Sequence, residues 1–185
     1  MRVIAGEARG RRLRSVPGDV TRPITDRVKE ALFNILGERV IGVCVLDLFA
    51  GTGSVGIEAL SRGARRAVFV EQDGRALRTI RENLLATNLR ERAEIIASDV
   101  FDYLAHLGPE EQFGFVYVAP PQYKGLWART LRVLDQKPPL TPQGVVVVQI
   151  FPKEYEPLAL SHLTLTDRRR YGSTLLCFYE PTSEE

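Results

Sequence analysis

The fold is decided at residues 45–56, which read Val45-Leu46-Asp47-Leu48-Phe49-Ala50-Gly51-Thr52-Gly53-Ser54-Val55-Gly56. An apolar run ends beside an acid, a glycine turn follows, and a helix-like segment begins directly after it. Glycines in the turn allow φ > 0 and a close approach of the backbone to a ligand, and the free N–H groups at a helix start favour polar or anionic groups. The stretch is typical of a strand–turn–helix unit that binds a nucleotide cofactor.

A second acid supports this interpretation. Residues 67–70 predict another strand, which ends in Glu71, about twenty residues after the first turn. Nucleotide-binding βαβ units place a ribose-binding acid at this point. Asp47 and Glu71 are therefore expected in one pocket.

The turn itself distinguishes between cofactors. A dinucleotide site usually reads G-x-G-x-x-G, whereas here Asp47 precedes the turn, and a carboxylate would repel a pyrophosphate. S-adenosylmethionine carries a sulfonium and an ammonium, so Asp47 suits its ammonium and Glu71 its two ribose hydroxyls. A dinucleotide remains the alternative cofactor, and a helix cap remains the alternative role of Asp47.

Strand-like and helix-like segments alternate along the rest of the chain. Thr25 can cap a first helix over residues 25–37, and the closing segments 163–170 and 173–179 predict an antiparallel hairpin. Alternation of this kind predicts an α/β fold, a parallel sheet covered on both faces. The expected strands are 43–48, 67–70, 93–96, 115–118 and 145–150, and the expected helices after the first are 55–61, 74–87 and 126–134.

Composition sets the class of protein. A hydrophobic content of 44% with 26% charged residues fits one α/β domain with a substantial core. The sequence shows neither an apolar run of about eighteen residues nor a leader pattern, so we expect no membrane span and a cytoplasmic protein. Cys44 and Cys177 lie in apolar runs without neighbouring ligands and are expected in the core, with no metal site.

Positive charge is concentrated at the front of the chain. The net charge is +2, but residues 1–29 alone carry +5. Glycines and prolines punctuate residues 1–24 and predict a short strand or hairpin arm, which we expect to be flexible and suited to phosphate contacts. A solvated arm without a ligand is the alternative. Residues 25–181 would then form the main domain and residues 182–185 a disordered tail.

Ligands of parallel sheets collect at the carboxyl ends of the strands, which adds two candidates. Asp99 follows a predicted strand and can accept a hydrogen bond from an exocyclic adenine amine, or be a simple surface residue. The turn at residues 119–123 contains Pro120-Pro121, whose carbonyls lack competing donors. Its aromatic residue, Tyr123, is suited to stack on a flipped base.

Residues 22–36 read Arg22-Pro23-Ile24-Thr25-Asp26-Arg27-Val28-Lys29-Glu30-Ala31-Leu32-Phe33-Asn34-Ile35-Leu36 and precede the turn at 47–53. With these motifs the chain resembles the RsmD-type bacterial small-subunit ribosomal RNA guanine-N2 methyltransferases. The similarity runs from Met1 to the Arg170-Tyr171-Gly172 turn. It implies a Rossmann-like S-adenosylmethionine-dependent methyltransferase domain with a mostly parallel sheet, and a methyl transfer to the exocyclic N2 of one guanine.

The resemblance also assigns residues, with small-subunit ribosomal RNA or the 30S particle as the partner of a monomeric enzyme. The expected cofactor contacts are Thr25, Asp47, Phe49, Gly51, Gly53, Glu71, Gln72, Asp99 and Val100. The expected target-base site comprises Ala119, Pro120, Pro121, Gln122 and Tyr123. The expected RNA contacts are Arg2, Arg9, Arg11, Arg12, Arg22 and Arg27.

One departure bears on catalysis. Relatives usually read Asp-Pro-Pro-Phe or Asp-Pro-Pro-Tyr at this turn, whereas this chain has Ala119-Pro120-Pro121-Gln122-Tyr123. Without the carboxylate, catalysis would depend on proximity and on the Pro120 carbonyl, with Gln122 as a replacement acceptor. An RNA-binding module that keeps the cofactor pocket but methylates weakly is the alternative. Methylation of DNA or protein is a third interpretation, disfavoured by the resemblance.

Overall fold

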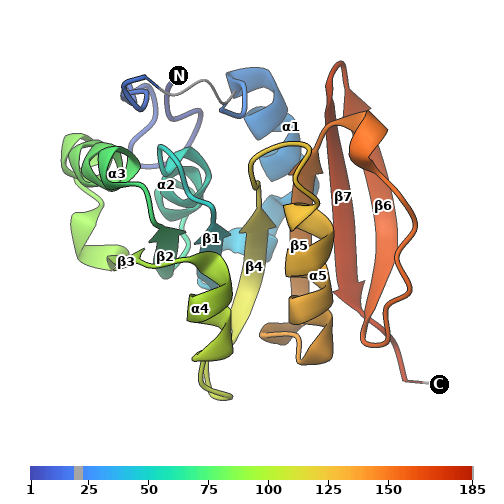
Figure 1. The fold of residues 1–185 in the computed structure, drawn as a ribbon. Helices are drawn as coiled ribbons and strands as arrows, with labels where there is room; N and C mark the ends of the chain where they lie inside the picture. The colour runs from blue at the N-terminus through green and yellow to red at the C-terminus, as the bar shows by residue number, and fades with distance from the viewer. Residues whose placement is uncertain (19–22, 185) are drawn as a thin grey trace.

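The computed structural model describes residues 1–18 and 23–184, and within them seven strands form one sheet in the order β3-β2-β1-β4-β5-β7-β6 (Figure 1). Five strands run parallel, and β7 is antiparallel to both of its neighbours. The predicted parallel sheet with an antiparallel hairpin is confirmed. The strands are β1 (Cys44–Leu48), β2 (Arg66–Glu71), β3 (Ala93–Ala97), β4 (Phe113–Val118), β5 (Leu140–Ile150), β6 (Leu163–Tyr171) and β7 (Thr174–Pro181).

Helices cover both faces of the sheet and enclose two cores. One core packs α1 (Asp26–Leu36), α2 (Ser54–Ser61) and α3 (Gly74–Thr87) against the sheet; the other packs α4 (Val100–Ala105) and α5 (Leu126–Gln136). Every residue of β1 is buried, as expected for a strand covered on both sides. Three short 3₁₀ helices complete the elements: η1 (Gly37–Val40), η2 (Arg90–Arg92) and η3 (Pro152–Glu154).

Two elements differ most from the sequence predictions. Helix α4 was not predicted because its six residues are too few to show a helical period; Asp99 starts it by accepting hydrogen bonds from Phe101 and Asp102. Strand β5 begins at Leu140 instead of residue 145, since its pairing with β4 continues past an irregularity between Phe113 and Phe115.

The expected flexibility of the amino-terminal arm is wrong for residues 1–18. Arg2 and Arg12 form an antiparallel β-bridge. Four apolar residues of the arm, which lie between its arginines in the sequence, are buried: Val3, Ala8, Leu13 and Val16. Gly6 lies so close to α2 that an added Cβ would stand 1.8 Å from the Ser61 carbonyl oxygen. The arm is therefore a docked part of the domain.

The structure also tests predictions that concern individual residues. Cys44 and Cys177 are free and buried, and burial raises the pKa of Cys177 to about 12. The Thr182 N–H donates to the His162 carbonyl, so the expected tail is attached at its first residue. The predictions for Arg22 and Glu185 lie outside the described residues. None of the helices in residues 1–18 and 23–184 has the length and apolar character needed to cross a bilayer.

Candidate active site

The predicted site residues meet at one edge of the sheet. In the register, Leu48 of β1 pairs with Val70 of β2 and with Val118 of β4, so the turns after these strands begin level with one another. Glu71 pairs with Ala97 two residues before Asp99, which places the end of β3 in the same row. Figure 1 shows this edge at the top, below the amino-terminal arm. The fold therefore brings Asp47, Glu71, Asp99 and the turn at 119–123 to one edge.

The glycine turn leaves room for a ligand above the backbone. Gly51 (φ 58°) and Gly53 (φ 77°) both have left-handed conformations, and a Cβ built on Gly51 would have no described atom within 4 Å other than those of Gly51 and its two chain neighbours. Phe49 has φ 59° as well, which costs a side-chain-bearing residue about 1–2 kcal/mol. Such strain at a non-glycine residue is concentrated at functional sites.

Asp47 is buried, with an exposed fraction of 1%, and its Oδ2 accepts the Gly56 N–H of α2 at 3.1 Å. Burial raises the pKa of Asp47 to about 8; the hydrogen bond from Gly56 opposes the shift and the negative charge of Glu71 adds to it. The helix-cap role is therefore present, although the capping position itself is Gly53. At neutral pH the carboxyl is therefore mostly protonated, and it can pair with a cation only by losing its proton.

Glu71 is fixed by three backbone N–H groups. Oε1 accepts from Gly51 at 2.9 Å, and Oε2 accepts from Gln72 at 2.8 Å and from Asp73 at 2.9 Å. A carboxylate has about four lone-pair positions, so one is left for a ligand hydroxyl in this arrangement. The structure connects Glu71 to the glycine turn itself, since Gly51 is its partner.

The remaining expected cofactor contacts have different surroundings. Asp99 uses Oδ1 to cap α4, and within the described residues no donor contacts its Oδ2, which leaves an acceptor free. Val100 buries its side chain in the second core. Gln72 is exposed beside Glu71, and Thr25 caps α1 by accepting the Val28 N–H at 3.2 Å.

The turn at 119–123 is braced by Glu154 of η3. Glu154 Oε1 accepts the Tyr123 N–H at 2.7 Å, and its Oε2 accepts the Phe151 N–H at 3.1 Å. Tyr123, with φ 60°, stacks on Phe151 at 5.5 Å between ring centroids, yet stays 67% exposed. One face of the ring that we expected to receive a base is thus covered by Phe151.

We expect Glu154→Ala to release this turn. The two hydrogen bonds are charge-assisted, so hydrogen exchange of the Tyr123 and Phe151 amides should accelerate by about 10- to 100-fold. Glu156→Ala, which removes an exposed acid two residues away, is the control and should leave both amides unchanged. Equal exchange rates in the two variants would show that Glu154 does not hold the turn.

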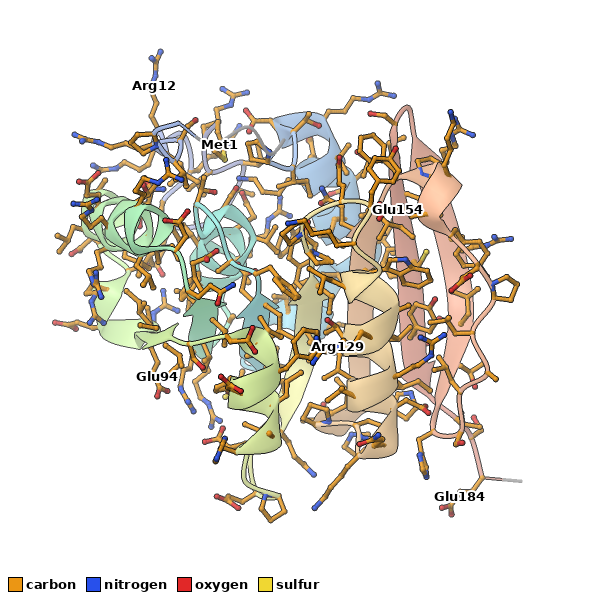
Figure 2. The ribbon with its side chains drawn as sticks, viewed as in Figure 1. Met1, Arg12, Glu94, Arg129, Glu154 and Glu184 are labelled. Carbon is orange, nitrogen blue, oxygen red and sulfur yellow. The ribbon has the colours of Figure 1, made fainter. Side chains whose placement is uncertain are left out.

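The expected RNA contacts are spread over the top of the arm and the start of α1. Arg9, Arg11, Arg12 and Arg27 are exposed, and Figure 2 shows Arg12 directed away from the body of the protein. Arg2 pairs with Asp26, Nε to Oδ2, at 3.8 Å. The arm and the start of α1, which carry these residues, lie at the edge of the sheet that holds the candidate site (Figure 1).

A buried charge network that the sequence analysis did not predict lies between α1 and α2. Lys29 and Glu58 are both completely buried and lie 3.3 Å apart, and Arg62 donates to Glu58 at 2.8 Å. Burial lowers the pKa of Lys29, an effect that Glu58 opposes. The available signal was the position of Lys29 on the apolar face of α1 beside Leu32 and Phe33.

Comparison with known proteins places the chain in a family. A family model described as "Conserved hypothetical protein 95" matches residues 1–180. The chain belongs to this family, which we call the RsmD family. The chain is similar to the putative rRNA methyltransferase YlbH of Bacillus subtilis, with 35% identity over 97% of this chain and 98% of the relative. The ribosomal RNA small subunit methyltransferase D of Escherichia coli K12 is 36% identical over 80% of this chain and 74% of the relative.

Solved structures agree with the RsmD-family assignment. A putative methyltransferase from Escherichia coli, YhhF, has a TM-score of 0.85 and 33% sequence identity. The match covers 100% of this chain and 99% of the YhhF chain. An RNA methyltransferase from Salinibacter ruber, solved with S-adenosyl-L-homocysteine, has a TM-score of 0.66 at 17% identity, which shows the shared fold. The expected methyltransferase-type fold is confirmed.

Proposed function

We propose that this RsmD-family chain transfers a methyl group from S-adenosylmethionine to the exocyclic N2 of a specific guanine in small-subunit ribosomal RNA. The observation that carries the proposal is the convergence of Asp47, Glu71, Asp99 and the Pro120-Pro121 turn at one edge of the sheet. Family membership supports it, because relatives bear the names of ribosomal RNA methyltransferases.

The residues present fit S-adenosylmethionine, which supplies an electrophilic methyl group on a sulfonium when bound. Asp99 Oδ2 is a free acceptor for an adenine amine, and Glu71 retains capacity for a ribose hydroxyl. Asp47 provides the negative charge for the ammonium, directly or through water. The open space above Gly51 admits the ligand next to these groups.

On the substrate side, the turn supplies acceptors without a carboxylate. Pro121 has no N–H, so the Pro120 carbonyl can accept a guanine amino group without a competing N–H in its own peptide group. Gln122 is exposed and adds an amide oxygen. The amino group needs orientation more than a strong base, because departure from a sulfonium is favourable.

The pKa of Asp47 predicts a pH-dependent affinity for the cofactor. Below about pH 8 the carboxyl must lose a proton before it can pair with an ammonium, so affinity should rise at least tenfold from pH 6 to pH 8. Calorimetric titration with S-adenosylhomocysteine measures this profile, and a constant affinity between pH 6 and 8 would contradict it.

Ala119 favours the second candidate function, a cofactor- and RNA-binding module with weak or altered methyl transfer. Under our proposal, Ala119→Asp adds an acceptor for the amino group and should raise kcat by about 10- to 100-fold in steady-state assays on unmethylated 30S particles. An unchanged or lower kcat would mean that the turn has its own working chemistry. Absence of transfer in both proteins would favour the module.

The chemical identity of the product tests the proposal itself. Small-subunit RNA transcribed in vitro, and 30S particles lacking guanine-N2 methylation, would be incubated with the protein and S-adenosylmethionine and then digested to nucleosides. Mass spectrometry should find N2-methylguanosine. A different methylated nucleoside would overturn the assignment of the target atom.

A further inference from the structure

The free edge of the sheet carries three consecutive arginines. Arg168, Arg169 and Arg170 are exposed at the end of β6, which is the last strand in the sheet order. Figure 1 shows the tip of the β6–β7 hairpin at the top of the molecule, on the edge where β4 ends. The amino-terminal arm lies at the other side of the same edge.

Two of these arginines point to the same face of the sheet. Arg168 pairs with Cys177 and Arg170 with Leu175, and both partners belong to the core under α5. Alternate residues of a strand lie about 7 Å apart. The Arg168 guanidinium lies 4.4 Å from the centroid of the Tyr155 ring, so this cation stands on an aromatic surface.

The same two arginines have no acidic partner among the described residues. Arg169 pairs with Asp167 at 2.9 Å, whereas Arg168 and Arg170 form no ion pair with any residue in 1–18 or 23–184. Arg170 Nε donates to the Gly172 carbonyl, which leaves its terminal nitrogens for another acceptor. The pair therefore presents two uncompensated guanidinium groups.

The register places this pair beside the candidate target-base turn. Arg170 pairs with Leu175, and Leu175 pairs with Ile150, so Arg170 is two strand spacings, about 10 Å, from Ile150. Ile150 directly precedes Phe151, on which Tyr123 stacks. A nucleotide chain that reaches Tyr123 has the hairpin arginines within its next few phosphates.

We propose that Arg168 and Arg170 bind the phosphate backbone of the substrate RNA, on the side of the site opposite the amino-terminal arm. Guanidinium groups match phosphate bidentately, and Arg keeps its charge at any physiological pH. The inference rests on the proposed function, because it takes its ligand from the reaction at the turn. Charged residues on a sheet edge also oppose edge-to-edge association, and this role predicts a different experimental result.

The test compares two double variants that remove the same charge. Arg168→Gln/Arg170→Gln changes the proposed contacts; Arg132→Gln/Lys137→Gln changes exposed cations on α5 and immediately after it, and neither of these makes an ion pair within the described residues. Binding of in-vitro transcribed small-subunit RNA would be measured from 50 to 200 mM salt. Cofactor affinity and the sedimentation coefficient of each free protein would be measured alongside.

Loss of two phosphate contacts should weaken RNA binding by roughly 25- to 60-fold at about 0.1 M salt and reduce the slope of log K against log salt by about 1.4–1.8. Arg168→Lys/Arg170→Lys should restore most of the slope, and the α5 control should match wild type. If the arginine variant binds RNA like the control, the inference is wrong.

A different result would overturn the proposed function alone. In that case wild-type protein binds cofactor, its RNA binding depends on Arg168 and Arg170 as predicted, and yet it transfers no methyl group. If the arginine variant associates with itself while its RNA affinity stays unchanged, the arginines protect the edge and the inference is likewise overturned.

Discussion

Glu58→Ala is expected to lower the free energy of unfolding by about 3–5 kcal/mol. Glu58 is completely buried in α2 and accepts hydrogen bonds from Ile4 N–H at 2.8 Å, Ala5 N–H at 3.1 Å and Arg62 Nε at 2.8 Å. Its carboxylate also balances Lys29 at 3.3 Å. Removing it leaves the buried Lys29 ammonium without a counter-charge, although Lys29 still donates to the Arg2 carbonyl and Ser54 Oγ, and it leaves two backbone donors without an acceptor.

Urea denaturation would measure this loss, and hydrogen exchange would locate it. The amides of Ile4 and Ala5 should exchange faster, because Glu58 attaches the arm to α2. Glu82→Ala is the matched control: Glu82 pairs with Arg14 at 3.4 Å but its side chain is 51% exposed, so the cost should stay below about 1 kcal/mol. A loss below 1 kcal/mol in Glu58→Ala, or unchanged arm amides, would show that the network does not hold the arm.

Asp47→Asn is expected to act in opposite directions on binding and on stability. Cofactor affinity should fall by about 100-fold, because the negative partner of the ammonium is lost. The free energy of unfolding at pH 8 should rise by about 1–3 kcal/mol, since the variant carries no buried charge. The pKa of Asp47 is raised from the ordinary value of 3.8 to about 8 in the folded protein. The stability of the wild type therefore falls as the pH rises between these two values. The asparagine side chain does not titrate, so the stability of the variant should not show this fall.

Asp135→Asn makes the same chemical change in a different environment. Burial alone would raise the pKa of Asp135, but the backbone N–H groups of Ser161, His162 and Leu163 outweigh it, and the pKa is lowered. Its contribution to stability is present above the ordinary pKa and lost as pH falls. This control should therefore lose stability at pH 8 and keep its cofactor affinity. Destabilisation of Asp47→Asn at pH 8 would contradict the account of Asp47.

The sheet was predictable because its strands are nearly continuous apolar runs and its turns contain glycine or proline. Helix α3 (Gly74–Thr87) has the predicted bounds, since Asp73 caps its start and Asn88, in a left-handed conformation, ends it. The docking of the arm was not predictable from charge. Its single apolar residues, such as Val3 and Leu13, are too widely spaced for a periodic signal, and their burial depends on α2 and α3.

The position of the site was predictable from the sequence, but the protonation of Asp47 and the stacking of Tyr123 were not. The rule that ligands gather at the carboxyl ends of strands brings Asp47, Glu71 and Asp99 to one edge, and the register agrees. The raised pKa of Asp47 and the stacking of Tyr123 on Phe151 depend on burial and on β5, which local sequence does not encode. Glu154 is likewise distant in sequence from the turn that it braces.

The most direct measurement of the central claim is the number of methyl groups transferred per RNA from labelled S-adenosylmethionine to unmethylated 30S particles, with Asp47→Asn beside wild type. The account predicts incorporation that approaches one methyl group per particle at a single guanine, and almost none in the variant under limiting cofactor. Tight binding of cofactor and RNA without incorporation in wild type would contradict it.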